Sequence, residues 1–304
     1  MQGTWGTQAP VLEQKMGIRP TRPWRYRVTL CIAAICQQNR RDRLIIATDW
    51  KSSTGEAGAE NQDKLKWITD NLPALLAGTV SRAIELRDTY RQYIEALANR
   101  TPSVRITHLN VADIMRKPPI LFKEKLVEEY IGLKFGLTYK GFREAVAKRE
   151  IPEAIATEAY TDIENIDLDC CLIIPIYIDK DAYIFKVDSD GGVERCDNFA
   201  AIGSGSSIAE ATLFQRKQED RMTLGRSGYH VYEAMKLGSI ASDVGQEHTI
   251  DLVYRPGEKG ATVVLETTSD KADRFLAAKF KKLGPTPFTK MPLPNRFWTA
   301  DVPG

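Results

Sequence analysis

The stretch Thr29-Leu-Cys-Ile-Ala-Ala-Ile35 is followed, after a polar interval, by Leu44-Ile-Ile-Ala-Thr-Asp49. Both runs are short, apolar and rich in β-branched residues, which is typical of buried strands. The polar residues 37–42 between them predict a hairpin loop that is longer than the tightest turns. The two runs therefore predict an antiparallel pair of strands, Leu30–Ile35 and Leu44–Thr48, with Thr29 directly before the first strand.

The next segment of the chain changes from strand to helix at Gly78. Short apolar runs at 65–68 and 74–77 predict two more strands. After Gly78, apolar residues recur at helical spacing up to about residue 99. A long helix is therefore expected directly after the second of these strands.

Residues 101–169 are the least regular part of the chain. Pro118, Pro119 and Pro152 are expected to break helices there, because proline lacks a backbone N–H and clashes with the preceding turn. The other elements are expected as short blocks. Helices are predicted near 121–133, 152–160, 208–216, 229–240 and 269–282, and strands near 171–178, 183–187, 199–202, 249–254 and 261–266.

The order of these blocks predicts the fold class. Strands and helices do not alternate singly, as they would in a parallel sheet built from βαβ units. Blocks of strands between pairs of helices favour antiparallel sheets that stack on one another and carry helices on their outer faces. The expected fold is therefore an α+β protein with a four-layer αββα sandwich.

Three segments are expected along the chain. Residues 1–28 show no sustained period and are interpreted as an N-terminal extension or propeptide. Residues 29–283 form the expected folded domain. Residues 284–304 form a proline-rich tail, which could dock on a neighbouring subunit or lie on its own subunit.

Composition and charge exclude several classes of protein. The chain has 304 residues, 43% of them hydrophobic, and a net charge of +2, so it can bury a sizeable core and has no strongly basic footprint for nucleic acid. No apolar run reaches the roughly 18 residues that a transmembrane helix needs. Residues 1–28 lack the apolar core of a secretory signal. We therefore expect a cytoplasmic protein that binds neither membranes nor nucleic acid.

The cysteines and histidines do not predict a metal site. The five cysteines show no Cys-x-x-Cys spacing and are interpreted as reduced core thiols, and the three histidines lie far apart in the sequence. We expect neither a metal nor an organic cofactor.

Five short landmarks follow one another along the chain. They are Leu44-Ile-Ile-Ala-Thr-Asp49, Gln62-Asp-Lys-Leu-Lys-Trp-Ile68, Leu76-Ala-Gly-Thr79, Tyr183-Ile-Phe-Lys-Val-Asp188 with Gly191-Gly192, and Ala201-Ile-Gly-Ser-Gly-Ser206. In this order they resemble the proteasome-type family of N-terminal-nucleophile hydrolases, and the resemblance covers about residues 29–266. That family includes proteasome subunits, bacterial proteins like the proteasome β-subunit, and a bacterial heat-shock peptidase with the same fold.

The resemblance implies a threonine peptidase that assembles into a homo-oligomer. In this reading Thr29 is the nucleophile and Lys64 is the buried cation beside it. Asp49 orients Lys64, and the backbone N–H of Gly78 binds the oxyanion. The substrate is a peptide or protein, and the sequence does not identify an ATPase partner.

Two further residues are assigned by the same resemblance. Ser204 corresponds to the serine of the family's Gly-Ser-Gly turn, which helps to hold the free amine. Asp243 corresponds to the aspartate that precedes the last strands. The sequence departs from the family pattern at Gln246, where a second serine is usual.

The chemistry of these residue types supports the assignment. A threonine hydroxyl is a weak nucleophile at neutral pH, and an α-amine with a pKa of about 8 is a suitable general base. A nearby lysine ammonium favours the unprotonated amine and stabilises a developing alkoxide. Glycine suits an oxyanion hole because it lets the substrate approach the backbone closely.

Other functions fit the same residues. Thr29 could be an ordinary strand threonine, and Asp49 and Lys64 a structural ion pair. The chain would then be a catalytically silent ring or scaffold subunit. A small-molecule amidase of the same fold is the third candidate.

The threonine mechanism requires a free α-amine on Thr29, which lies inside the written sequence. Self-cleavage between Val28 and Thr29 would expose that amine. Alternatively, a GTG codon at Val28 could be read as the initiator methionine, which an aminopeptidase would remove before threonine. By either route, we expect Thr29 to be the N-terminal residue of the mature protein.

Overall fold

The structure is a computed structural model that describes residues 29–49, 51–54, 57–60, 64–100, 106–240, 247–259 and 263–283. For 51–54 and 57–60 it describes the backbone alone. The described part is a mixed α+β fold with two five-stranded antiparallel sheets, as expected at that level of detail. None of the described helices is long and apolar enough to cross a membrane.

The first sheet carries the strand pair that begins after Thr29. Its strands follow the spatial order β10-β1-β2-β11-β12, and all neighbours are antiparallel. They are β1 (Leu30–Gln38), β2 (Arg41–Asp49), β10 (Phe199–Gly203), β11 (His248–Tyr254) and β12 (Val264–Thr267).

The hairpin between β1 and β2 is tighter than the sequence predicts. Gln38 pairs with Arg41, so only Asn39 and Arg40 form the turn. Both have positive φ, at 53° and 61°, as the two central residues of a type I′ turn do. The expectation of a longer loop is therefore wrong, because polar residues continue both strands beyond the apolar core.

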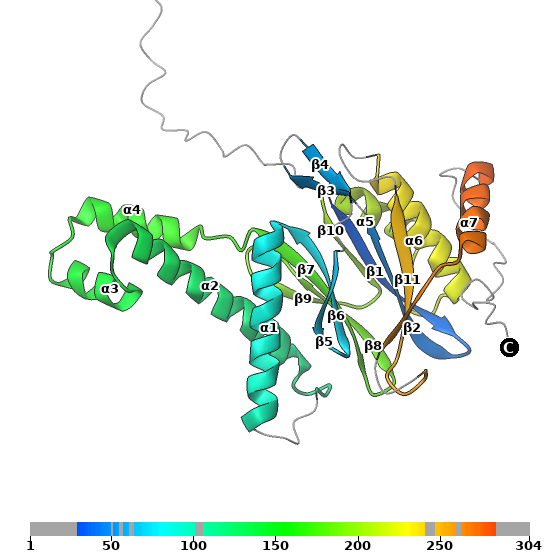
Figure 1. Cartoon of the computed structure of the whole chain (residues 1–304), viewed down its shortest axis with the longest axis horizontal. Coiled ribbons are helices and arrows are strands. Elements are labelled where there is room, and N and C mark those ends of the chain that lie inside the picture. Colours follow the sequence, from blue (N-terminus) through cyan, green and yellow to red (C-terminus); the bar gives the residue numbers. More distant parts are fainter. Residues whose placement is uncertain are drawn as a thin grey trace, which may run out of the picture.

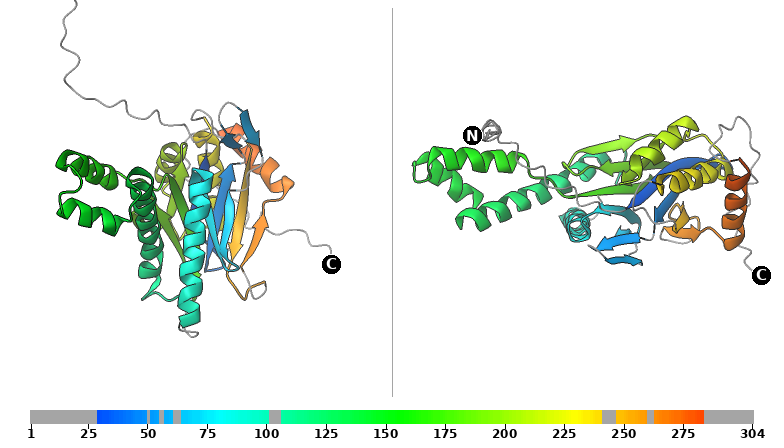
Figure 2. Two further views of the ribbon diagram at one scale, coloured as in Figure 1. Left: turned by 60° about the vertical axis from the view of Figure 1, so that its left-hand side comes forward. Right: turned by 90° about the horizontal axis from the view of Figure 1, so that it is seen from above.

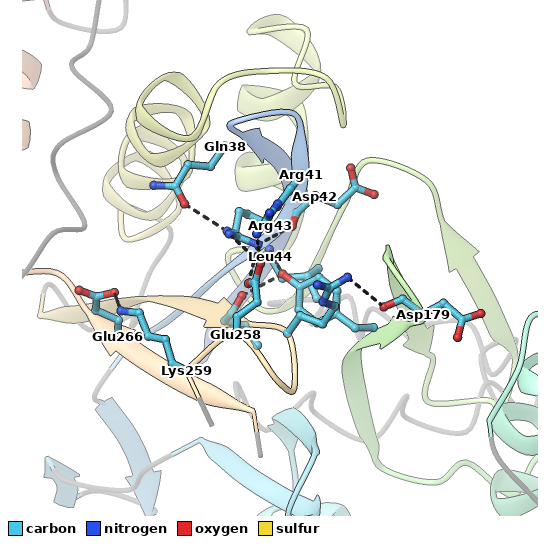
Figure 3. A network of polar contacts seen from close by, with 12 residues as sticks. Gln38, Arg41, Asp42, Arg43, Leu44, Asp179, Glu258, Lys259 and Glu266 are labelled. Atoms are coloured by element: carbon cyan, nitrogen blue, oxygen red, sulfur yellow. Dashed lines mark hydrogen bonds and ion pairs between the residues drawn. The ribbon is translucent and has the colours of Figure 1, made fainter. Parts of the chain in front are cut away.

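A polar network explains why these strands extend so far (Figure 3). Arg43 is nearly buried, and its guanidinium binds the side chains of Gln38 and Glu258. The Tyr177 hydroxyl of the second sheet accepts from the Leu44 N–H and donates to a carbonyl of β11. These contacts join both sheets near the turn, at the end of β2 that lies away from Asp49.

The second sheet follows the order β5-β6-β7-β8-β9 and is also antiparallel. Its strands are β5 (Leu65–Thr69), β6 (Leu72–Gly78), β7 (Cys170–Ile178), β8 (Asp181–Val187) and β9 (Val193–Cys196). A separate hairpin, β3 (Lys51–Thr54) and β4 (Ala57–Glu60), lies in the sequence between the two sheets.

The two sheets pack face to face because β1 is apolar on both sides. Cys31 and Ile35 point toward the second sheet and lie in one buried cluster with Ile173 of β7. Leu30 and Ile32 belong to another buried cluster, which joins the first sheet to helices. This arrangement buries the strand that follows Thr29 on both faces.

Helices cover the outer face of each sheet, as the view from above in Figure 2 shows. The second sheet packs on α1 (Val80–Arg100) and on the first part of α2 (Val111–Phe135). The first sheet packs on α5 (Ser206–Gln215), α6 (Leu224–Gly238) and α7 (Asp270–Leu283).

A helical arm extends from the sheets (Figure 1). It consists of the end of α2 with α3 (Tyr139–Ala147) and α4 (Glu153–Glu164). The arm has its own small core, in which Ile131, Phe142 and Ala159 are buried. The sequence analysis placed helices on both sides of α3 but did not predict α3 itself.

Most of the other predicted elements are confirmed within a few residues. The helix expected after Gly78 is α1, and the strands expected at 171–178 and 183–187 are β7 and β8. The strand expected at 261–266 is described only from residue 263 onward.

The predicted helix break at Pro118 and Pro119 is wrong, because α2 continues through both residues. In a regular helix the Met115 carbonyl would accept from the N–H of residue 119, which proline lacks. The hydroxyl of Tyr90, on α1, donates to that carbonyl instead, at 2.6 Å. A side chain from the neighbouring helix therefore supplies the hydrogen bond that the proline removes.

Tyr90→Phe is expected to lower the free energy of unfolding by about 1–2 kcal/mol, because it leaves the Met115 carbonyl buried without its donor. Tyr93→Phe is a matched control on the same helix, since no described residue bonds its hydroxyl. Denaturant unfolding of both variants measures the difference. Equal stability of the two would contradict the role of Tyr90.

A second buried network fixes β1 against the helices of the first sheet. The Gln218 amide donates to the carbonyl of Ile35 in β1 and to the hydroxyl of Ser227 in α6. His230 of α6 bonds the Gln218 side-chain oxygen through Nδ1, at 3.0 Å. Burial lowers the pKa of His230 from 6.5 to about 3, and the nearby Arg226 and Arg216 contribute.

The depressed pKa of His230 predicts a specific loss of stability in acid. Between pH 6.5 and about 3 the unfolded chain binds a proton on this histidine that the folded chain does not. The free energy of unfolding should therefore fall as the pH falls through this range. His230→Asn should flatten that dependence, because asparagine does not titrate in this range. Urea unfolding at a series of pH values provides the measurement.

Candidate functional site

Four of the expected site residues meet where β1 begins and β2 ends. Thr29 and Asp49 come from the first sheet, Ser204 follows β10, and Lys64 lies directly before β5 of the second sheet. Hydrogen bonds of Ser204 to Thr29, and of Asp49 to both Lys64 and Leu30, connect the group. Residues far apart in the sequence therefore converge on the first two residues of the strand pair.

Asp49 is the centre of this group. Its Oδ1 accepts from the Lys64 ammonium at 2.5 Å and from the N–H of Leu30 at 2.7 Å. The Asp49 side chain is fully buried, and only 7% of the Lys64 side chain is exposed. Because each charge would be costly to bury alone, the two side chains hold one another in place between the sheets.

Ser204 holds the backbone of Thr29 from the other side. Its hydroxyl lies 3.4 Å from both the nitrogen and the carbonyl oxygen of Thr29, accepting from the first and donating to the second. In a chain that begins at Thr29, this nitrogen would be the α-amine. The Ser204 hydroxyl would then lie 3.4 Å from the amine, and its expected role in holding the amine stays a prediction.

Gly203 makes this contact possible, although the sequence analysis assigned it no role. Its φ is +100°, and a Cβ at this position would lie 2.0 Å from the carbonyl oxygen of Thr29. Glycine alone permits such an approach. The signal in the sequence was a glycine at the end of a predicted strand, directly before the site serine.

Gly78 ends β6 on the second sheet. The N–H of Leu76 donates to the carbonyl of Lys64 at 2.9 Å, toward β5. Amides two residues apart in a strand point to the same edge, so the Gly78 N–H is directed to the same side as the Lys64 backbone. This direction suits the expected role of Gly78 as an oxyanion donor.

Asp243 lies outside the described residues, as does Gln246. The structure therefore does not place the sixth expected site residue.

The cysteines offer no competing nucleophile at this site. None of the five forms a disulfide in the described structure, and Cys31 is fully buried with its Sγ 3.6 Å from the carbonyl of Leu76. Burial raises the pKa of Cys171 to about 11 and that of Cys196 to about 12, so both are protonated at neutral pH. In the part of the chain that the structure describes, no group of three or more His, Cys, Asp or Glu could hold a metal ion.

Comparison with models of known protein families and with curated proteins finds no match for this chain. The function must therefore be inferred from the geometry of the site and from the order of the sequence landmarks.

The buried Lys64–Asp49 pair leads to a prediction about stability that holds whether or not the chain is an enzyme. Lys64→Met alone leaves the Asp49 carboxylate buried without its cation, and should lower the free energy of unfolding by about 3 kcal/mol or more. Adding Asp49→Asn to Lys64→Met removes the buried charge and keeps an acceptor for the Leu30 N–H. The double variant should therefore be more stable than Lys64→Met, as measured by denaturant unfolding. The opposite order would mean that the pair is not coupled as the contacts indicate.

Proposed function

We propose that this chain is a threonine-type N-terminal-nucleophile hydrolase that cleaves peptide bonds, as a proteasome-like peptidase does. One observation carries the proposal. The buried Lys64–Asp49 pair and the Ser204 hydroxyl converge on the backbone of Thr29 and Leu30. Ser204 contacts the backbone of Thr29 directly, and the ion pair holds the adjacent Leu30 through Asp49. Thr29 therefore lies at a fixed position before a buried strand, where a free α-amine would act as its base.

The arrangement of the elements supports the same proposal. Two antiparallel sheets pack on each other, and helices cover their outer faces. We propose that this is the four-layer αββα sandwich of the N-terminal-nucleophile hydrolases. In that fold the candidate site lies at one end of the sheets, where strands of both layers finish.

The proposed reaction begins with a free α-amine on Thr29. The amine takes the proton of the Thr29 hydroxyl as Oγ attacks the substrate carbonyl carbon. The positive charge of Lys64 favours the neutral amine and stabilises the alkoxide, while the Gly78 N–H donates to the developing oxyanion. The protonated amine then gives its proton to the leaving amine, and an ester to Thr29 remains.

Water completes the cycle. The α-amine accepts a proton from water, which attacks the ester carbonyl and releases the acid product and the threonine hydroxyl. This chemistry requires neither a metal nor an organic cofactor. The proposal also includes assembly into a homo-oligomer and, for Asp243, a supporting role near the amine, both taken from the family that the sequence resembles.

A catalytically silent subunit is the second candidate. The observation that favours it is the position of the Lys64–Asp49 pair, which links the first sheet to the residue that precedes β5 and could serve this purpose alone. The two candidates differ in whether Thr29 becomes the N-terminal residue and reacts.

A chain whose translation begins with Met directly before Thr29 is expected to hydrolyse peptides, because removal of the methionine exposes the α-amine. Thr29→Ala should abolish hydrolysis, and Thr29→Ser should retain it, since serine keeps a hydroxyl beside the amine. Lys64→Ala should also abolish hydrolysis in the protein that remains folded. The measurements are turnover of a fluorogenic peptide library and the mass of the N-terminal peptide.

A chain that still carries residues 1–28 should be inactive unless it cleaves itself before Thr29. Hydrolysis by intact protein that still carries residues 1–28 would contradict the mechanism. Inactivity of protein that is shown to begin at Thr29 would favour the silent subunit. A small-molecule amidase would cleave short amides and leave the peptide library intact.

A further inference from the structure

Asp169 lies beside the proposed oxyanion donor and has no assigned role. It is the last residue before β7, in the short link after α4, and its partner is Thr79, which directly follows Gly78. The Thr79 N–H donates to the Asp169 carbonyl at 2.8 Å, and the Thr79 hydroxyl donates to the Asp169 carboxylate at 2.6 Å. Two hydrogen bonds thus attach one aspartate to the residue that follows the proposed donor.

The backbone of Asp169 is in an unusual conformation. Its φ is +62°, in the left-handed region that residues other than glycine adopt rarely and at a cost. Aspartate and asparagine tolerate this region better than most residues. A specific contact is therefore expected to favour the conformation, and the two bonds to Thr79 supply it.

Neighbouring residues hold Asp169 in this place. Its N–H donates to the Asp167 carboxylate at 2.6 Å. Leu168 is fully buried in the cluster between the second sheet and its helices, and its N–H donates to the Ser189 carbonyl at 2.7 Å. The link from Asp167 to Asp169 is thus anchored to the second sheet on the side of β6 away from Lys64.

The contact with Thr79 fixes the peptide that directly follows Gly78. The peptide between Gly78 and Thr79 is directed toward β7, because its N–H binds Asp169. Gly78 itself has a φ of +96°, and a Cβ there would lie 2.7 Å from the Asp169 carbonyl oxygen and 2.6 Å from the Cα of Cys170. Asp169 therefore restrains the peptide that follows Gly78 and lies close to the Gly78 α-carbon itself.

We propose that Asp169 is a positioning residue for the oxyanion hole, which fixes the direction of the Gly78 N–H through Thr79. This inference rests on the proposed function, because an oxyanion exists only if the chain catalyses acyl transfer. Asp169 does not touch the substrate in this role. A tightly held donor needs no reorganisation as charge develops on the substrate oxygen, and this is the main source of its effect on rate.

A purely structural role would have different consequences. Thr79 precedes α1, and its carbonyl accepts from the N–H of Ala83, so Asp169 could serve only to fix the start of that helix. Loss of the contact would then lower stability and the fraction of active protein. It would not alter the turnover of each correctly folded molecule.

The test compares two pairs of variants in the form of the protein that hydrolyses peptides. Asp169→Gly accepts a positive φ but removes the carboxylate, whereas Asp169→Asn keeps an acceptor oxygen. Thr79→Val removes the hydroxyl from the other partner, and Thr79→Ser keeps it. A covalent label for an N-terminal threonine gives the active fraction, by which each kcat is corrected.

Asp169→Gly and Thr79→Val are expected to lower the corrected kcat by roughly 10- to 100-fold, with KM changed less than about threefold, because a misdirected donor acts on the transition state. Asp169→Asn and Thr79→Ser should stay within about threefold of the unchanged protein. Inhibition by a peptide aldehyde, whose adduct with Thr29 places an oxygen in the oxyanion hole, should weaken in parallel with kcat. Binding of the matching peptide alcohol should not change.

Three results would overturn the inference. If the corrected kcat of Asp169→Gly and Thr79→Val is unchanged while the unmodified protein is active, Asp169 is structural and the proposed function stands. If kcat falls but aldehyde inhibition does not, the effect does not pass through the oxyanion hole. If protein beginning at Thr29 neither hydrolyses peptides nor reacts with the label, the proposed function fails and this inference fails with it.

Discussion

The buried ion pair between Asp49 and Lys64 is the contact on which the candidate site depends. It joins Asp49, at the end of β2 in the first sheet, to Lys64, which directly precedes β5 of the second sheet. The two sheets therefore cannot shift at this end without separating two buried charges. The same carboxylate oxygen accepts from the N–H of Leu30, and this bond fixes the backbone next to Thr29. At the opposite end of β2, Arg43 and its partners hold the strands in a comparable way (Figure 3). The sheets are thus fastened by polar contacts at both ends of an apolar interior.

The chain segment that contains the helical arm leaves and re-enters the second sheet beside Gly78. The polypeptide leaves the second sheet after Gly78, runs through α1 to α4, and returns to it at Cys170 (Figure 1). Gly78 and Cys170 are register partners, so the chain leaves and re-enters at adjacent positions. Two hydrogen bonds from Thr79 to Asp169 join the segment that leaves the sheet to the segment that returns. The point where the chain returns from the arm to the second sheet therefore lies beside the proposed oxyanion donor.

Three residues of the site region have an unusual backbone conformation. Gly78, Gly203 and Asp169 all have positive φ. Gly203 directly precedes Ser204, and Asp169 directly precedes Cys170, the register partner of Gly78. At Gly203 a side chain would collide with Thr29, and at Gly78 it would collide with the backbone of Asp169 and Cys170. Such conformations persist only where the surrounding contacts determine them, as they do in many functional sites. The proposed hydrolase requires such fixed positions at the site, since its amine and oxyanion donor must both be held still.

The sequence by itself determined the order and type of most elements, because alternating or helical spacing of apolar residues is a local signal. It also indicated Thr29, Asp49, Lys64, Gly78 and Ser204 through short landmarks in a particular order. Only the tertiary structure decided the tight turn at Asn39 and Arg40, the continuity of α2 through two prolines, and the conformation of Asp169. Each of these depends on a partner far away in the sequence: Glu258 for the strands beside the turn, Tyr90 for the helix, and Thr79 for the aspartate. A local pattern carries no information about such a partner, because the contact exists only after the chain has folded.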